Sequence, residues 1–276
     1  MSILHRSTSS WILFFYFFLE HGNFQEFGGC SPDGILQILF KLTYAKIHGW
    51  KGHGKGGVYV YESCQTKSFL CGRTEVIRTA TLASNQFVDY MMEHELLHKN
   101  ININVARDLF QKAAKKHVDI AKLASNGQGV DRHLFSLFRL AEMEDGGGGG
   151  GGGGKQLPSI FMDPAWSLSN TSVLSTSNLS SESFHGMGYG PVVKHGYGLA
   201  YGICQDTLYF GISNFVTHEV EGVEGEGEKE KKSGGFGGVM LESMNDISKV
   251  PTNAEIFKNE LFQTLRTMRK IMSSAD

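Results

Sequence analysis

Several short segments carry residues whose types and spacing could do chemistry. Residues 94–98 read His-Glu-Leu-Leu-His, a pattern that places two imidazoles one helical turn apart as zinc ligands, beside a glutamate base. No third ligand follows at a recognised spacing, and the Asn-Ile alternation of residues 100–104 predicts that the helix ends there. We interpret the pattern as an exposed, charged helix end, and a zinc hydrolase stays open as the alternative.

Hydroxyl groups gather at Ser175, Thr176 and Ser177, directly after an expected strand at residues 171–174. Clustered hydroxyls can donate hydrogen bonds to an oxyanion that develops during acyl transfer, although a polar strand end is the more common explanation. Residues 61–63, 72–78 and 131–133 gather arginines, acids and a histidine, and such groups usually form ion pairs. Each segment alone is therefore compatible with either a catalytic role or a purely structural one.

Composition argues against other classes of protein. The chain has 276 residues, of which 41% are hydrophobic and 20% charged, and this suits one large domain or two small ones. Its net charge of −2 argues against a non-specific nucleic-acid binder. The four cysteines form no C-x-x-C pair, which indicates reduced thiols in an intracellular protein.

The N-terminal region contains one apolar run, Trp11 to Leu19. It has nine residues, whereas a transmembrane helix needs about 20. No small-residue cleavage site follows it, as a signal peptide would require. We expect a buried strand or a segment foreign to the fold, and no membrane span.

Periodicity and turn residues predict the elements that must position the chemical groups. Helices are expected at residues 31–48, at 104–124, from 131 onward and after 252, because apolar residues recur there at helical spacing. A strand is expected at 58–61, and a hairpin at 197–203 and 208–213. Low-complexity glycine-rich stretches predict flexible insertions at 144–156 and 219–249. Together these elements predict an α/β (α+β) fold.

Taken in order along the chain, the segments resemble the choline/carnitine O-acyltransferase family, and most of all its carnitine O-acetyltransferase members. The resemblance covers roughly residues 28–273 apart from the insertions. The matching segments are Ser31-Pro32-Asp33-Gly34, Tyr61-Glu62-Ser63, Gly72-Arg73-Thr74-Glu75, Asp131-Arg132-His133-Leu134, Phe161-Met162-Asp163, Leu174-Ser175-Thr176-Ser177, Gly190-Pro191-Val192-Val193 and Gly196-Tyr197-Gly198.

The resemblance implies a fold and a reaction. The family has two domains that resemble chloramphenicol acetyltransferase, each a mixed sheet with flanking helices. The expected division is an unmatched segment at 1–27 and a C-terminal acyltransferase domain at 28–276. Family members exchange an acyl group between coenzyme A and the hydroxyl of carnitine or choline, with no metal. The expected partners are therefore carnitine, acyl-CoA and a missing N-terminal half-domain.

The resemblance also implies residue roles. Ser177 matches the oxyanion donor. The substrate-binding positions are matched by Tyr61, Thr74, Arg132, Ser175 and Met187, and the coenzyme A positions by Asp33, Ser63 and Asn178. Thr74 and Arg132 stand where choline-specific members have valine and asparagine, so carnitine is the expected acceptor. A methionine at Met187 implies a short acyl group, although the adjacent Gly188 resembles the long-chain pattern.

Departures from the family pattern qualify this expectation. The family's catalytic histidine begins an H-x-x-x-D-G motif, and none of the 11 histidines of this sequence does so. Lysines that bind coenzyme A phosphates precede the serine-proline-aspartate motif in the family, whereas residues 22–29 contain no lysine. We therefore expect a truncated chain that is inactive alone, or a non-catalytic binding module. The family implies a mitochondrial or peroxisomal location, and the chain ends without a peroxisomal signal.

Overall fold

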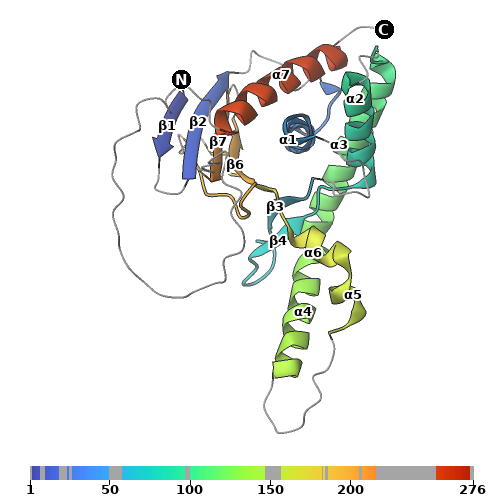
Figure 1. Cartoon of the computed structure of the whole chain (residues 1–276), viewed down its shortest axis with the longest axis vertical. Helices are drawn as coiled ribbons and strands as arrows, with labels where there is room; N and C mark the ends of the chain where they lie inside the picture. The colour runs from blue at the N-terminus through green and yellow to red at the C-terminus, as the bar shows by residue number, and fades with distance from the viewer. Residues whose placement is uncertain are drawn as a thin grey trace, which may run out of the picture.

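The structure is a computed structural model. It describes residues 2–6, 10–18, 24, 27–49, 58–96, 100–146, 157–181, 183, 186–204, 207–215 and 253–273. These residues form one mixed sheet with helices packed on one of its faces (Figure 1). The predicted mixed sheet with flanking helices is therefore confirmed.

The sheet has seven strands in the order β1-β2-β7-β6-β5-β3-β4. Strand β5 runs parallel to both of its neighbours, β3 and β6, and the other pairs are antiparallel. The strands are β1 (Ser2–Arg6), β2 (Ser10–Phe18), β3 (Val60–Gln65), β4 (Thr74–Ile77), β5 (Leu174–Asn178), β6 (Tyr197–Ile203) and β7 (Thr207–Phe215).

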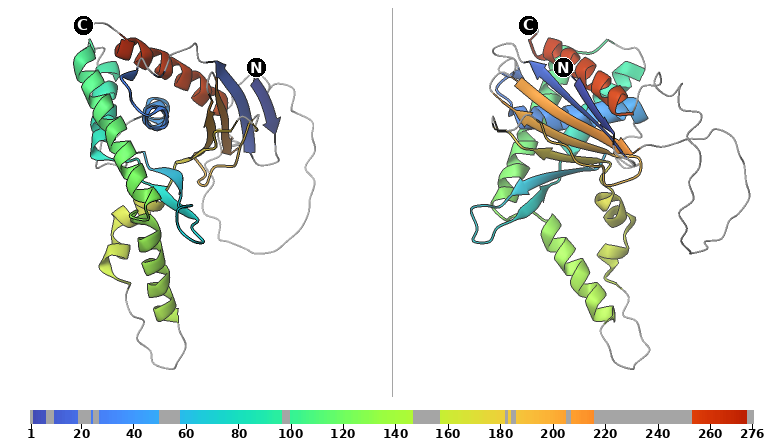
Figure 2. Two further views of the ribbon diagram at one scale, coloured as in Figure 1. Left: turned by 180° about the vertical axis from the view of Figure 1, so that it is seen from behind. Right: turned by 90° about the vertical axis from the view of Figure 1, so that its left-hand side faces the viewer.

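Helices cover one face of this sheet, and the opposite face carries no described helix (Figure 2, right). Helix α1 lies in the middle, with α7 and α3 beside it, while α4 projects from the body next to α5 and α6 (Figure 1). The helices are α1 (Pro32–His48), α2 (Leu82–Leu96), α3 (Ile103–Ser125), α4 (Asp131–Gly146), α5 (Ser159–Met162), α6 (Pro164–Asn170) and α7 (Asn253–Ser273). None of the described helices is both long and apolar enough to span a membrane.

Helix α1 is almost entirely buried because it lies between the sheet and the other helices. Phe40 meets the rings of Tyr201 and Phe210 edge-on, at centroid distances of 5.2 and 6.1 Å. The amine of the next residue, Lys41, is also buried and donates to Ser84 Oγ at 2.9 Å. Burial lowers the pKa of Lys41 to about 7, since an apolar environment disfavours the charged amine.

Most predicted elements are present. The helix at 31–48 is α1, the predicted hairpin is β6–β7, and the apolar N-terminal run forms β2, which pairs with β7. Helix α4 continues to Gly146, so the insertion begins later than the predicted residue 144, and residues 147–156 and 216–252 lie outside the described residues. Helix α2 was expected only at its C-terminal end, because residues 94–96 belong to the segment interpreted as a helix end.

One prediction was wrong. The hydroxyl segment 175–177 lies inside a strand, β5, instead of following one at 171–174. Polar residues can occupy a strand interior here because β5 is paired on both sides, and its side chains find hydrogen-bond partners on both faces.

The projecting helix α4 is fixed to the body at its first turn. Arg78 forms an ion pair with Asp131 and also donates to the carbonyl of Ser169 at 2.5 Å. The Glu75 carboxylate accepts the backbone N–H of Arg132 at 3.2 Å, as acids at helix N-termini commonly do. These contacts set the position from which Arg132 projects.

We expect Arg78→Gln to lower the free energy of unfolding by about 1–3 kcal/mol, because a part-buried Asp131 loses its charged partner. Arg139→Gln is the matched control, since Arg139 forms an exposed pair with Glu142 on the same helix and should cost under about 0.5 kcal/mol. Urea unfolding measures both values. Equal effects of the two substitutions would show that Arg78 does not anchor α4.

Candidate active site

Strand alternation places Tyr61, Ser63, Ser175 and Ser177 on the uncovered face of the sheet. On β3, Glu62 points to the helices and is 2% exposed, so its neighbours Tyr61 and Ser63 point to the other face. On β5, Ser175 and Ser177 also point to this other face, because Thr176 between them points to the helices. Because Tyr61 is the register partner of Ser175, the two strands present these groups side by side.

The structure brings Tyr61, Thr74 and Arg132 together. Arg132 Nη2 donates to the Tyr61 hydroxyl at 3.3 Å, and Arg132 Nε donates to the Thr74 carbonyl at 3.2 Å. The three residues come from β3, β4 and the first turn of α4. The result is a guanidinium, a phenol and a threonine at one edge of the sheet, a combination that suits a carboxylate.

Two serine hydroxyls meet next to this group. Ser63 Oγ and Ser177 Oγ are 3.1 Å apart, and either can be the donor. When Ser63 donates to Ser177, the proton of Ser177 is available to another acceptor. This hydroxyl pair can therefore donate a hydrogen bond to an oxyanion above the sheet.

Asp33 and Asn178, predicted at the coenzyme A site, also lie in contact. Asn178 Nδ2 donates to Asp33 Oδ1 at 2.9 Å, and the hydroxyl of Tyr201 donates to the same oxygen at 2.6 Å. Met187 is half-buried, two residues before Tyr189. The Tyr189 hydroxyl donates to the carbonyl of Ser175 at 2.9 Å and so holds this segment against β5.

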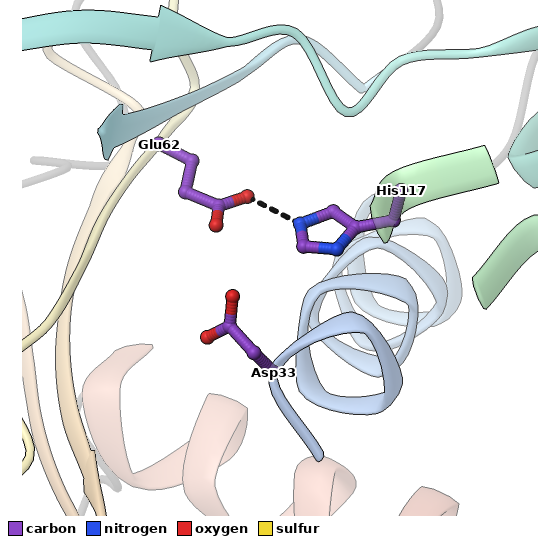
Figure 3. Close-up of side chains that lie close together, drawn as sticks. All are labelled: Asp33, Glu62 and His117. Carbon is purple, nitrogen blue, oxygen red and sulfur yellow. Dashed lines mark hydrogen bonds and ion pairs between the residues drawn. The ribbon is translucent and has the colours of Figure 1, made fainter. Parts of the chain in front are cut away.

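A buried polar cluster behind the sheet was missed by sequence reasoning. His117 on α3 is 4% exposed, and its Nε2 lies 2.8 Å from Glu62 Oε2. Asp33 points toward both side chains (Figure 3). The spacing of His117 from Phe110 and Ala113 puts it on the apolar side of α3, and this was the signal available in the sequence.

The environment shifts both titrating groups of this cluster. Burial, reinforced by the nearby carboxylate of Asp33, raises the pKa of Glu62 to about 7. Burial alone would lower the pKa of His117, but its hydrogen bond with Glu62 and the charge of that carboxylate outweigh burial and raise it. The ligand atoms of Asp33, Glu62 and His117 lie within 4.8 Å of one another, so by residue type they could hold a divalent cation.

The alternative zinc motif lies partly outside the described residues, which do not include Leu97 and His98. Within the motif, His94 Nδ1 lies 2.8 Å from the carbonyl of Tyr90, and its ring centroid lies 4.0 Å from that of the Tyr90 ring, at a tilt of 36°. This arrangement ties His94 to its own helix.

Comparison with known proteins gives the family. The Choline/Carnitine o-acyltransferase model matches residues 18–225. The chain is 33% identical to carnitine O-palmitoyltransferase 2, mitochondrial, of Xenopus tropicalis over 69% of its own length and 26% of the relative. It is 34% identical to the mitochondrial carnitine O-acetyltransferase of Saccharomyces cerevisiae, over 67% of this chain and 25% of the relative. The chain thus spans about a quarter of the length of these relatives, and it belongs to the choline/carnitine O-acyltransferase family.

Proposed function

We propose that this chain forms the carnitine-binding and oxyanion-binding part of a site at which an acyl group passes between coenzyme A and carnitine. The observation that carries the proposal is the placement of Arg132, Tyr61 and Thr74 beside the Ser63–Ser177 hydroxyl pair on one face of the sheet. The guanidinium supplies a partner for the carboxylate of carnitine, which choline lacks. The names of the relatives supply the reaction.

The transfer requires a base as well as this binding surface. A base takes the proton of the carnitine hydroxyl, the oxygen attacks the thioester carbonyl, and the carbon–sulfur bond breaks to release the thiol of coenzyme A. Ser177 would donate to the oxyanion of the tetrahedral intermediate. The sequence has no H-x-x-x-D-G motif, so we propose that the base comes from a partner half-domain and that the chain alone does not turn over.

Exposed apolar side chains support a missing partner. On the projecting helix α4, Phe135, Leu137, Leu140 and Met143 are 42–70% exposed. The chain also spans only a quarter of its relatives. We propose that residues 28–276 form a domain like chloramphenicol acetyltransferase, with insertions after α4 and at 219–249, and that its uncovered surface meets the other half. The segment 1–27 adds strands β1 and β2 to the sheet of this domain.

Asp33, Ser63 and Asn178 are the proposed contacts for coenzyme A, and no metal is required for the reaction. These contacts do not include any for the phosphates of coenzyme A, because residues 22–29, where the family has its phosphate-binding lysines, lack lysine. The relatives named above are mitochondrial proteins. We propose a mitochondrial location, with the peroxisome as the family's other compartment.

The first test is binding by the chain itself. Carnitine should bind, as measured by calorimetry, while acyl transfer from acetyl-CoA should be undetectable. Arg132→Asn should weaken carnitine binding about tenfold or more, because a charge-assisted hydrogen bond contributes roughly 1.5–3 kcal/mol. Choline is the control ligand, since it lacks the carboxylate and should be indifferent to the substitution. Unchanged carnitine affinity would refute the role of Arg132, and turnover by the chain alone would refute the missing base.

Ser177→Ala tests the oxyanion role in a full-length enzyme rebuilt around this chain. Loss of one oxyanion donor typically lowers kcat by ~10²–10³ and leaves KM nearly unchanged. Ser136→Ala is the control, because Ser136 is exposed on α4 and bonds only within its own helix in the described structure. A substitution that mainly raises KM would reassign Ser177 to substrate binding.

Met187 carries the proposal that the acyl group is short. The half-buried side chain of Met187 would fill the end of the acyl pocket, and each methylene accommodated contributes about 0.8 kcal/mol. In the rebuilt enzyme, Met187→Gly should therefore raise the kcat/KM ratio of octanoyl-CoA to acetyl-CoA about tenfold or more. A parent enzyme that already prefers palmitoyl-CoA to acetyl-CoA would overturn this proposal.

A further inference from the structure

The two strands that carry the proposed site share a pattern. Each has two hydroxyl side chains on the uncovered face, Tyr61 and Ser63 on β3 and Ser175 and Ser177 on β5. Between each pair lies one polar residue that points to the helices and is nearly inaccessible: Glu62 at 2% exposure and Thr176 at 1%. Because neighbours on a strand point to opposite faces, whatever holds the middle residue also fixes the other two.

Helix α1 holds the middle residue of β5. Gln37 Nε2 donates to Thr176 Oγ1 at 2.9 Å, and Thr176 Oγ1 donates to the carbonyl of Tyr61 at 2.9 Å. Gln37 also donates to the hydroxyl of Tyr201, which in turn donates to Asp33. In each of these hydrogen bonds the donor is an uncharged amide or hydroxyl. The hydrogen bonds therefore persist as the pH changes near neutrality.

Helix α3 holds the middle residue of β3, and this contact carries charge. Glu62 Oε2 lies 2.8 Å from His117 Nε2 inside the fold. The partly buried carboxylate of Asp33 faces this buried pair (Figure 3), so two acids meet one imidazole. An uncompensated buried charge is costly, and the cluster must keep a proton or a cation.

The geometry favours the proton. The nitrogen–oxygen distance of 2.8 Å is that of a direct hydrogen bond. Asp33 Oδ1 already accepts from Tyr201 and Asn178. His117 Nδ1 has no hydrogen-bond partner among the described residues, whereas the second nitrogen of a metal-bound histidine usually donates to an acceptor.

We propose that His117 is a positioning residue whose protonated contact with Glu62 holds the centre of β3, and with it Tyr61 and Ser63, so that the order of the site depends on pH. The inference rests on the proposed function only for what Tyr61 and Ser63 do, not for how they are held. His117 itself contacts neither substrate nor reacting atoms.

Two further titratable groups face the cluster, and burial moves the pKa of neither toward neutral pH. Burial raises the pKa of Tyr201 on β6 and of Cys64 on β3, both of which lie close to Glu62. The pKa values of Glu62 and His117 are both raised, so the native state keeps protons that the unfolded chain releases. The stabilisation is therefore present at low pH and is lost as pH rises through about 7 and above.

The test is hydrogen exchange of the backbone amides of the intact chain, measured without ligand between pH 6 and 9. After correction for the intrinsic pH dependence of exchange, protection at residues 61–63 should fall about tenfold or more as pH rises, the equivalent of one pKa unit. Glu62→Gln should remove this fall, because burial lowers the pKa of a His117 that has lost its carboxylate partner, and Glu62→Gln combined with His117→Gln should flatten the curve, because neither titrating group remains. His94→Gln is the matched control. It should leave the pH dependence of protection at residues 61–63 unchanged, since His94 lies on α2 and bonds to its own helix.

Three results would overturn the proposal: a flat pH curve in the unaltered chain, a curve that survives both cluster substitutions, or equal loss of protection in every strand. Stoichiometric metal in the purified chain would overturn it as well. If both variants fail to fold, nitrogen NMR of His117 in the unaltered chain decides, since its titration must coincide with the change at Ser63.

Carnitine titration at the same pH values separates this proposal from the proposed function. Binding that weakens in parallel with the loss of protection supports both. If carnitine binds at no pH while the amides still respond, the positioning role stands and the proposed function fails.

Discussion

The structure depends on one constraint at the neighbouring strands β3 and β5. Both strands present hydroxyl groups on one face of the sheet, and the buried polar residue at the centre of each strand must find hydrogen-bond partners on the opposite face. Thr176 meets this demand with neutral hydrogen bonds. Glu62 makes a greater demand, because a buried carboxylate needs both a donor and a positive charge. His117 supplies both from α3, and without it the centre of β3 would carry an unpaired acid.

Helix α1 serves two purposes in this arrangement. Its apolar residues fill the core, as Phe40 does between Tyr201 and Phe210. Its polar residues Asp33, Gln37 and Lys41 follow at intervals of four and drift around the helix, from the ends of β5 and β6 toward α2. Each of the three has hydrogen-bond partners, which explains how a helix with so many polar groups can be buried.

The carboxylate-binding group is assembled differently. Tyr61 and Thr74 lie on paired strands, but Arg132 reaches them from the start of α4, which projects from the body. The position of Arg132 depends on Arg78, Asp131 and Glu75, which hold the first turn of α4. Polar contacts between elements therefore fix this helix, whereas apolar packing fixes the helices on the sheet. The site therefore combines a rigid part on the sheet with a part held by charged contacts.

The sequence alone determined the elements with strong local signals. Helix α1 follows from Ser31-Pro32 and its apolar spacing, and the β6–β7 hairpin follows from alternation. The ordered motifs determined the family, because many short matches at fixed spacing are far more specific than any one of them. They also pointed to Tyr61, Thr74 and Arg132, which the structure brings together.

Only the tertiary structure decided the rest. The hydroxyl segment 175–177 is a strand because β3 and β6 pair with it on both sides, and local sequence does not record that pairing. Helix α2 has weak periodicity, so packing against α3 determines it more than propensity does. The contact of His117 with Glu62 joins residues that are 55 positions apart. A histidine among apolar residues shows that a side chain is buried, but only the fold can show which charge it meets there.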